Sequence, residues 1–146
     1  MDFTVRDIGV ADASRVAQLS AQFGYPVDEA VMQKRIQSLD RNRRAVLVAC
    51  SNDGVVGWID VCENRSLAVG SYAEIGGLVV SESSRNAGIG AQLVASAERW
   101  ACDRGLNRMV VRSQVAREAA HRFYLREGYR RIKTSVVFTK ELIPTS

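Results

Sequence analysis

The sequence predicts a single-domain mixed α/β fold with a mostly antiparallel central sheet and flanking helices. Three observations support this prediction. Strand-length apolar runs are interspersed with segments of helical periodicity. The turn signal Asn52-Asp53-Gly54 joins two apolar runs as an antiparallel hairpin. A late strand–helix–strand order predicts one parallel strand pair. The 146 residues, 47% hydrophobic and 25% charged, suit one domain over residues 1–146.

The first half of the chain is expected to form a strand, two helices and a hairpin. Residues 3–7 alternate apolar and polar side chains, as a half-buried strand does. Apolar residues then recur at helical spacing until Pro26, and Asp28 is a good N-cap for a second helix. The expected elements are a strand at 3–7, helices at 12–23 and 28–39, and strands at 45–50 and 55–61.

The second half is expected to alternate strands and helices. Gly76 and Gly77 interrupt an apolar strand and indicate a bulge or a close backbone approach. Gly105 and Gly128 follow amphipathic stretches and end two helices. The expected elements are a polar loop at 63–70, a strand at 73–80, a helix at 88–104, a strand at 109–112, a helix at 118–127 and one or two strands at 129–142.

Composition and charge exclude several classes of protein. No apolar run approaches the roughly 18 residues of a membrane span, and the acidic start does not match a signal peptide, so no membrane partner is expected. Three dispersed cysteines and one histidine predict reduced thiols, a cytoplasmic location and no metal. The net charge is +4, yet only residues 41–44 form a basic cluster. The alternative of a basic nucleic-acid-binding domain is therefore disfavoured.

The chemically informative segment is Arg85-Asn86-Ala87-Gly88-Ile89-Gly90, which links a strand to a helix. Its glycines allow tight backbone conformations and close approach of a ligand. The first turn of the helix presents unpaired N–H groups at the positive end of the helix dipole, beside Arg85. This combination predicts a cradle for phosphate groups. The spacing is neither that of a dinucleotide fingerprint nor that of a Walker A loop.

This segment resembles the acetyl-CoA-binding motif of the Gcn5-related N-acetyltransferase superfamily, Q/R-x-x-G-x-G/A. The later Phe123-Tyr124, followed by Gly128-Tyr129, is similar to the family's second signature. The resemblance extends over the order of elements from Phe3 to Leu142. It implies the acyl-CoA N-acyltransferase fold, in which the strand before the glycine-rich turn splays from the next, parallel strand.

The resemblance also implies an activity, the direct transfer of an acetyl group from acetyl-CoA to a primary amine. Arg117 departs from the family pattern, in which an asparagine bonds to the pantetheine arm. It either reaches a cofactor phosphate or is simply exposed. The residues implied to bind acetyl-CoA are Leu78, Val79, Val80, Arg85, Asn86, Ala87, Gly88, Ile89, Gly90, Ala91 and Arg117.

Two catalytic residues follow from the same resemblance. Tyr124 aligns with the family tyrosine that protonates the leaving thiolate, and a phenol is protonated at neutral pH. Glu74 stands eleven residues before Arg85, where one branch of the family has a glutamate that acts as base through water. Asp60 and Glu63 are alternative bases.

The acceptor amine is left open by the sequence. It is a small-molecule or peptide amine, and an aminoglycoside 6'-amine is one alternative. A polycation of that kind would need an acidic pocket, for which Asp28, Glu29, Asp60, Glu63 and Glu74 are candidates. Residues 24–44, including Tyr25, Met32 and Arg35, are expected to set acceptor specificity. A non-catalytic acyl-CoA-binding or sensing module is the alternative function. A C-terminal strand at 135–140 could pair across a two-fold axis and form a homodimer.

Overall fold

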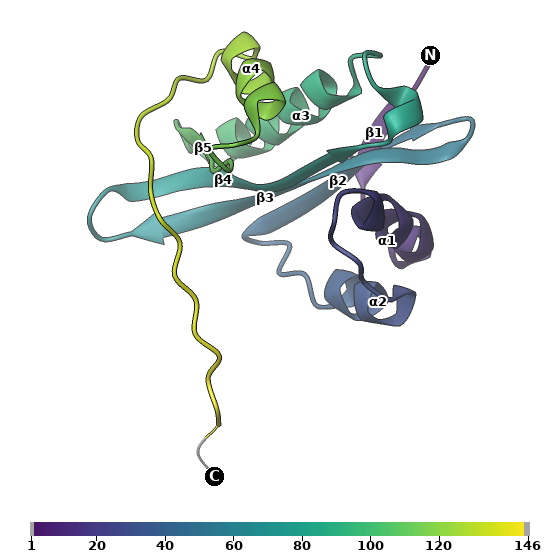
Figure 1. The fold of residues 1–146 in the computed structure, drawn as a ribbon, viewed down its shortest axis with the longest axis horizontal. Coiled ribbons are helices and arrows are strands. Elements are labelled where there is room, and N and C mark those ends of the chain that lie inside the picture. Colours follow the sequence, from purple (N-terminus) through teal and green to yellow (C-terminus); the bar gives the residue numbers. More distant parts are fainter. Residues whose placement is uncertain (1, 145–146) are drawn as a thin grey trace. The chain divides into compact units, whose positions relative to one another are not determined.

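The computed structural model describes residues 2–144, and the chain divides into two compact units between Arg112 and Ser113. The first unit contains a five-stranded sheet and three α-helices, and the second contains one helix and an extended C-terminal segment (Figure 1). The elements are β1 (Thr4–Asp7), α1 (Ala13–Gln22), α2 (Glu29–Gln37), β2 (Arg44–Ser51), β3 (Gly54–Ser66), β4 (Gly70–Val80), α3 (Ile89–Asp103), β5 (Met109–Val111) and α4 (Glu118–Arg126). The expectation of one domain over residues 1–146 stays a prediction.

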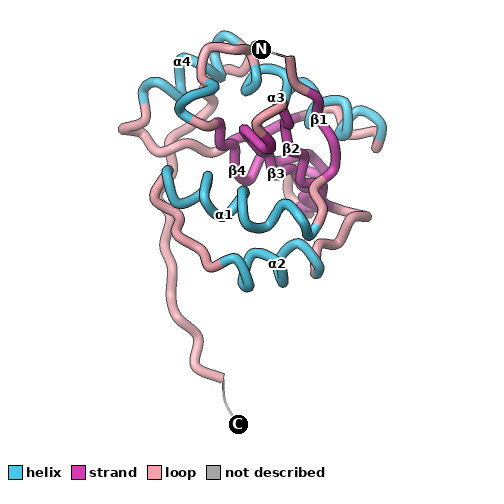
Figure 2. Tube along the Cα trace, turned by 90° about the vertical axis from the view of Figure 1, so that its right-hand side faces the viewer, coloured by secondary structure: helices cyan, strands magenta, loops and turns pink. Residues whose placement is uncertain are grey.

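The sheet has the strand order β1-β2-β3-β4-β5. The first three pairings are antiparallel, and β4 pairs with β5 in parallel. Helices α1 and α2 cover one face of the sheet, and α3 covers the opposite face (Figures 1 and 2). This mixed, mostly antiparallel sheet with flanking helices is the fold class predicted from the sequence.

Apolar side chains fill both layers between helix and sheet. On the α1 and α2 face, Leu19 and Ile36 belong to a buried cluster with Val48. On the other face, Gly57 lets α3 approach the sheet closely. A Cβ placed on Gly57 would lie 3.3 Å from both Ile89 Cγ2 and Leu93 Cδ1. The absence of a side chain at this position therefore fixes how closely the first turns of α3 pack on β3.

A β-bulge interrupts β4 at the glycine pair, as the sequence predicts. Asp60 of β3 pairs with Gly77, and the next pair is Val61 with Ile75, so Gly76 is the extra residue. A Cβ on Gly77 would lie only 3.0 Å from Cη2 of the Trp58 ring. Position 77 therefore requires glycine, and the bulge lies where β4 passes the Trp58 ring.

The same point marks the end of the parallel ladder. Residues Ala73–Ile75 pair with Met109–Val111, and no β5 partner follows beyond Ile75. Residues 77–80 continue to pair with β3 alone. The two parallel strands therefore part at the bulge, which is the splayed arrangement that the family resemblance implies.

The expected polar loop at 63–70 is wrong. β3 runs to Ser66 and β4 begins at Gly70, so only three residues form the turn between them. The paired residues from Glu63 to Ser66 are mostly polar because this end of the hairpin extends beyond the apolar core. Cross-strand backbone bonding holds it as a ladder without an apolar side-chain pattern.

The expected C-terminal strand or strands within 129–142 are also wrong, because no strand is assigned after β5 among the described residues. The apolar side chains of this segment are 65–90% exposed, and they are Ile132, Val136, Val137, Phe138, Leu142 and Ile143. A strand exists only when its backbone groups pair with a neighbouring strand. The segment has the amino-acid composition of a strand, but no strand pairs with it among the described residues.

Helix α2 begins after Asp28, as predicted, although the Asp28 side chain makes no capping hydrogen bond. Over residues 2–144, no helix combines the length and apolar character needed to cross a membrane.

Candidate functional site

The loop between β4 and α3 has the backbone conformation of an anion-binding turn. Gly88 is the N-cap of α3 with a φ of 80°, and Asn86 has a φ of 67°. The first hydrogen bond of the helix is donated by the Gln92 N–H to the Gly88 carbonyl at 3.1 Å. The N–H groups of Ile89, Gly90 and Ala91 therefore have no acceptor within the helix. These groups, at the positive end of the helix dipole, suit a phosphate.

Arg85 adds a positive charge at the start of this loop. Its side chain is exposed, and its guanidinium lies 5.1 Å from the centre of the Phe23 ring at the end of α1. A cation over an aromatic face is weakly attracted to it, so Phe23 restrains Arg85 without neutralising its charge. The guanidinium stays available to an anionic ligand.

The last residues of β4 provide an open backbone edge. Val79 is buried in the core, whereas Leu78 and Val80 are half-buried. Because β5 has left the sheet at Ile75, the β5 side of residues 76–80 has no strand partner among the described residues. Unpaired backbone groups here can accept an extended ligand in the manner of an added strand. Only residues 81–84 separate this edge from the cradle in the chain.

A polar strip lies on the sheet face that α1 and α2 cover, next to the bulge. We use this name for Arg44, Asp60, Cys62 and Glu74. In the antiparallel register, Arg44 and Glu74 both pair with Cys62, and Asp60 is two residues from Cys62 on β3. Directly paired and alternate strand residues share one face, so all four side chains belong to the same surface.

Asp60 is the carboxyl of the polar strip that pairs with Arg44. It accepts hydrogen bonds from Arg44 Nη1 at 2.8 Å and 2.6 Å, through Oδ1 and Oδ2. Burial raises its pKa above the ordinary range, and the nearby Arg44 charge offsets part of this increase. A Cβ on Gly76 would lie 3.4 Å from Asp60 Oδ2, so this carboxylate lies against the bulge.

Glu74 is at the other end of the strip, two residues before the bulge. Its Oε1 is 3.5 Å from Arg112 Nε, an ion pair that lacks hydrogen-bond geometry. This oxygen is buried and has no hydrogen-bond partner among residues 2–144. A buried carboxylate oxygen without a donor is costly, and a water or substrate N–H would satisfy it. Glu74 thus has an open acceptor where the base is expected.

Cys62 lies between the two carboxyl groups. Burial raises the pKa of its thiol, the nearby Arg44 charge offsets part of this increase, and the negative charges of Asp60 and Glu74 raise the pKa further. The thiol therefore stays protonated at neutral pH and is a poor nucleophile. Covalent catalysis by Cys62 is disfavoured.

Glu63, the third candidate base, is unsuited to the role. It is one residue from Cys62 in β3, and its side chain therefore belongs to the opposite sheet face. Arg65 Nε donates a 2.7 Å hydrogen bond to Glu63 Oε2, and this contact lowers the pKa of the carboxyl. Glu63 is both turned away from the polar strip and a weaker base than an ordinary glutamate.

A cavity of about 400 Å³ opens between α2 and the sheet, next to the polar strip. Arg44 and Asp60 belong to its lining, together with Trp58, whose Nε1 is buried without a hydrogen-bond partner among the described residues. Met32 and Arg35, two of the three residues predicted to set acceptor specificity, also line it. Its other lining residues are Ile8, Val16, Ile36, Ser38, Leu39, Asp40 and Val46.

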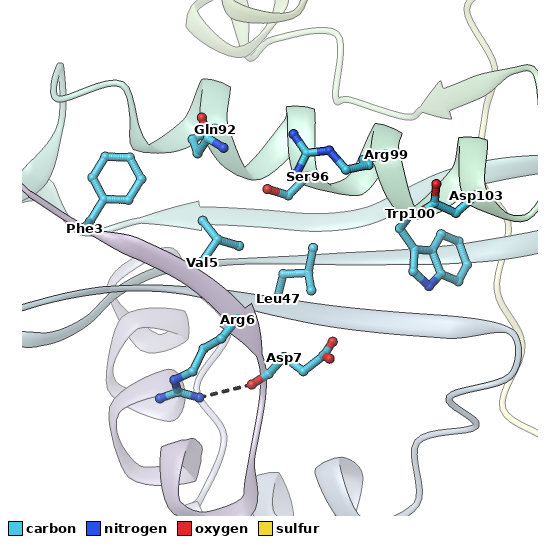
Figure 3. Close-up of a pocket in the computed structure, with 10 residues that line it drawn as sticks. All are labelled: Phe3, Val5, Arg6, Asp7, Leu47, Gln92, Ser96, Arg99, Trp100 and Asp103. Atoms are coloured by element: carbon cyan, nitrogen blue, oxygen red, sulfur yellow. Dashed lines mark hydrogen bonds between the residues drawn. The ribbon is translucent and has the colours of Figure 1, made fainter.

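A larger groove of about 560 Å³ lies between β1 and α3, and its lining runs from Phe3 at one end past Val5 to Trp100 at the other (Figure 3). It contains none of the residues predicted to bind the cofactor or to catalyse. Its charged lining residues are Arg6, Asp7, Arg99 and Asp103, and Arg6 Nη1 donates to the Asp7 carbonyl at 3.1 Å. None of the residues that line this groove belongs to β4, the strand that contains the bulge. The smaller cavity is therefore the better candidate for an acceptor site.

The second unit carries Tyr124 and Arg117. Tyr124 packs edge-on against Phe123 and Tyr129, with ring centres 5.1 Å and 5.7 Å apart. Burial raises the pKa of the Tyr124 phenol, and the positive charge of Arg117 partly opposes this. The phenol therefore keeps its proton at neutral pH and can donate it. Arg117 is the N-cap of α4.

His121 has a structural role within the second unit. Arg131 Nη2 is 3.3 Å from its Nδ1, and its Nε2 is 2.9 Å from the Gln114 carbonyl. An arginine only donates, so Nδ1 accepts and Nε2 carries the proton that is given to Gln114. Both ring nitrogens are used to tie together the segments that flank α4.

The structure therefore brings Glu74, Asp60 and Arg44 together beside the bulge, with the cradle at the end of the same strand. Tyr124 and Arg117 belong to the second unit, and each unit is described by itself. Sequence reasoning missed Trp58 and Arg44. The spacing of two between Trp58 and Asp60 on one strand would place them on one face, but only the sheet register identifies Arg44 as their neighbour. Residues 2–144 contain no cluster of His, Cys, Asp or Glu suited to a metal ion.

A parallel strand pair that parts at a bulge, followed by a phosphate cradle, defines a protein of the acyl-CoA N-acyltransferase fold. A sequence model of the acetyltransferase (GNAT) family matches residues 14–129, most of the chain. The chain belongs to this family.

Two relatives and one solved structure illustrate the similarity. The chain is 38% identical to the aminoalkylphosphonate N-acetyltransferase of Salmonella typhimurium over 96 residues, which are 65% of this chain and 61% of that protein. It is 29% identical over 132 residues to an uncharacterized N-acetyltransferase of Chlorobaculum tepidum, covering 90% of this chain and 78% of that one. An aminoglycoside N-acetyltransferase solved in complex with CoA is 16% identical, with a TM-score of 0.84, and the match covers 97% of this chain and 96% of that one. This last match shows the fold alone.

Replacing Arg44 with Gln tests the electrostatics of the polar strip. Asp60 has a raised pKa in the folded state, so its ionised form is unfavourable there, and the loss of Arg44 removes the charge that offsets this. We expect Arg44→Gln to lower the free energy of unfolding by about 1–2 kcal/mol above the folded-state pKa of Asp60, since Arg44 is partly exposed. The deficit should shrink as the pH falls below the raised folded-state pKa of Asp60, because the carboxyl is then protonated in the folded wild type and in the folded variant alike. Urea denaturation at pH 8 and pH 4 measures this.

The matched control places Arg44→Gln in an Asp60→Asn background. There the effect of Arg44→Gln should be small and nearly independent of pH. An equal deficit at both pH values, with Asp60 present, would contradict the assignment.

Proposed function

We propose that the chain is an N-acetyltransferase that transfers an acetyl group from acetyl-CoA directly to a primary amine of a small molecule or peptide. The observation that carries this proposal is the parting of β4 from β5 at Gly76, directly before the cradle at the start of α3. An open strand edge suits the amide-bearing arm of CoA, and the free helix N–H groups suit its pyrophosphate.

The residues present fit this co-substrate. Leu78, Val79 and Val80 would offer backbone groups to the pantetheine arm. The turn at 85–88 and the first turn of α3, Ile89 to Ala91, would hold the phosphates, with Arg85 adding charge. Nothing lies within 4 Å of a Cβ placed on Gly88, so the space beside this residue is open. Bound there, an acetyl thioester supplies an acyl carbon that a neutral amine can attack.

Two side chains are proposed to move protons. Glu74, whose Oε1 lacks a hydrogen-bond donor, accepts a proton from the incoming ammonium, directly or through water. Tyr124, whose raised pKa keeps the phenol protonated, donates to the leaving sulfur. Arg117 is proposed to reach a cofactor phosphate. The protonated Cys62 thiol supports transfer without an acyl-cysteine step.

The family supports several acceptor classes. The relatives are named for aminoalkylphosphonate and aminoglycoside substrates. The aligned part of this chain spans only 61% of the aminoalkylphosphonate N-acetyltransferase. An aminoalkylphosphonate is therefore one candidate acceptor for this chain. The three free cysteines support a reducing compartment such as the cytoplasm.

We also propose that the chain forms a homodimer through its C-terminal segment. The segment at 132–143 has the apolar composition of a strand, and Phe138 is 90% exposed. An exposed segment with six apolar side chains favours an intermolecular partner, and strand pairing with a second copy would satisfy its backbone. Sedimentation equilibrium should give twice the 16.1 kDa monomer mass, and Phe138→Asp should shift it to the monomer. A monomeric wild-type protein at micromolar concentration would refute this.

Replacing Tyr124 with Phe tests the proposed reaction. The phenyl ring keeps the packing with Phe123 and Tyr129 but cannot donate a proton, so turnover should fall by about 10²–10⁴-fold. Binding of acetyl-CoA, measured by calorimetry, should change less than twofold. The assay follows free-thiol release with the best acceptor from a screen of amino acids, polyamines, aminoglycosides and lysine peptides.

Tyr129→Phe is the control, because it also removes one hydroxyl from the same aromatic cluster. It should retain most of the activity. Unchanged turnover in Tyr124→Phe would contradict the role of Tyr124 as the acid that protonates the leaving sulfur. Tight acetyl-CoA binding without turnover on any acceptor would instead favour the alternative of a non-catalytic sensing module.

A further inference from the structure

The cavity beneath α2 has charges of both signs. Its lining contains two arginines, Arg35 and Arg44, and two aspartates, Asp40 and Asp60, so the formal charges cancel. A polycationic acceptor would need an excess of carboxylates to offset its desolvation. The cavity offers no such excess, although the sequence had left an acidic pocket open.

Hydrogen bonding in the cavity leaves donors without acceptors. Asp60 already accepts from Arg44, and Asp40 Oδ1 accepts from the Asn42 N–H at 3.1 Å. The Arg35 guanidinium, by contrast, is exposed and has no ion pair or hydrogen bond among the described residues, and the Nε1–H of Trp58 is buried without an acceptor. The side-chain donors that remain free match a ligand group that accepts hydrogen bonds and carries negative charge.

The opposite side of the cavity reaches the reaction centre. Asp60 lines the cavity and lies against Gly76, where β4 leaves β5. Trp58 packs on Gly77 in the same way. An amine held near Asp60 would therefore lie at the bulge, next to Glu74 on the same face of the sheet. A ligand that spans the cavity would have its amine at this side and its other end toward α2.

We propose that the acceptor is a primary amine that bears one anionic group, a carboxylate or a phosphonate, with Arg35 binding the anion and Asp60 orienting the ammonium. This inference rests on the proposed function and defines its acceptor class. Arg35 and Asp60 are specificity-determining residues, and proton removal remains with Glu74. The transfer forms one C–N bond and breaks one C–S bond. The nitrogen loses two protons between the ammonium and the amide: one passes through Glu74 to solvent, and the other balances the proton that Tyr124 gives to the departing thiolate.

The experiment compares four amines of similar length: 3-aminopropanoate, 2-aminoethylphosphonate, propylamine and 1,3-diaminopropane. Kanamycin adds a polycationic arm. Free-thiol release should give a kcat/KM at least tenfold higher for an anionic amine than for propylamine, the diamine or kanamycin. The better of the first two substrates identifies the anion as carboxylate or phosphonate.

The variant Arg35→Gln should lose this preference. Its KM for the anionic amines should rise tenfold or more, while kcat changes less than twofold, because the anion is bound equally before and during the reaction. Lys34→Gln is the matched control. It removes the same charge from the neighbouring residue of α2, which is exposed and does not line the cavity. Its kinetics should match those of the wild type.

Binding without turnover gives an independent readout. In a Trp100→Phe background, Trp58 is the only tryptophan and reports on the cavity. Both anionic amines should change the fluorescence of Trp58, and propylamine should not. In the Arg35→Gln variant, the affinity for the anionic amines measured by this titration should fall at least tenfold.

The outcomes separate the two proposals. Preferred acetylation of propylamine, the diamine or kanamycin would overturn the acceptor class and leave the proposed function in place. Anionic amines that bind beside Trp58 while no amine is acetylated would support the pocket and contradict the proposed function. An Arg35→Gln variant with wild-type KM and fluorescence response would overturn the role of Arg35.

Discussion

The extra residue at Gly76 is the constraint on which the rest of the first unit depends. With Gly76 unpaired and the Trp58 ring occupying the space beside Gly77, β4 changes its register with β3 at this point. The parallel ladder with β5 ends one residue earlier, at Ile75. A continuous five-stranded ladder would have no free edge in its interior. The bulge creates such an edge between two strands, and the following chain leads directly into the glycine-rich start of α3. A side chain at Gly77 would have to displace an indole that packs against the buried core.

The bulge also organises the polar residues. Register brings Arg44, Asp60, Cys62 and Glu74 to one face of the sheet, although they come from three strands. Each carboxyl group of this strip has an arginine partner, Arg44 for Asp60 and Arg112 for Glu74. The two pairs differ in quality. Asp60 accepts two short hydrogen bonds, whereas Glu74 keeps a buried oxygen without a donor. The satisfied carboxylate is suited to orienting a ligand, and the unsatisfied one is suited to accepting a proton.

Much of this organisation could be predicted from local sequence. The glycine pair, the R-x-x-G-x-G turn and the helix that follows are short-range features, because glycine conformations and helix starts are decided by neighbouring residues. Trp58 and Arg44 could not be found in this way, since their proximity to Asp60 and Gly77 depends on the pairing of three strands. The strand residues near Ser66 could not be predicted either, because their pairing does not bury an apolar face. The expected strand or strands within 129–142 rest on composition alone. Strand formation there requires a partner edge, and composition cannot supply one.

Amide hydrogen exchange with and without acetyl-CoA tests most directly whether the gap between β4 and β5 is the cofactor site. The backbone amides of residues 76–80 that are not donated to β3, and those of Ile89 to Ala91, have no strand or helix acceptor. Saturating acetyl-CoA should slow exchange at these two segments by tenfold or more. Residues that line the groove between β1 and α3, such as Val5 and Ser96, should be unaffected. Protection confined to that groove, or unchanged exchange at residues 76–80 despite bound acetyl-CoA, would contradict the account.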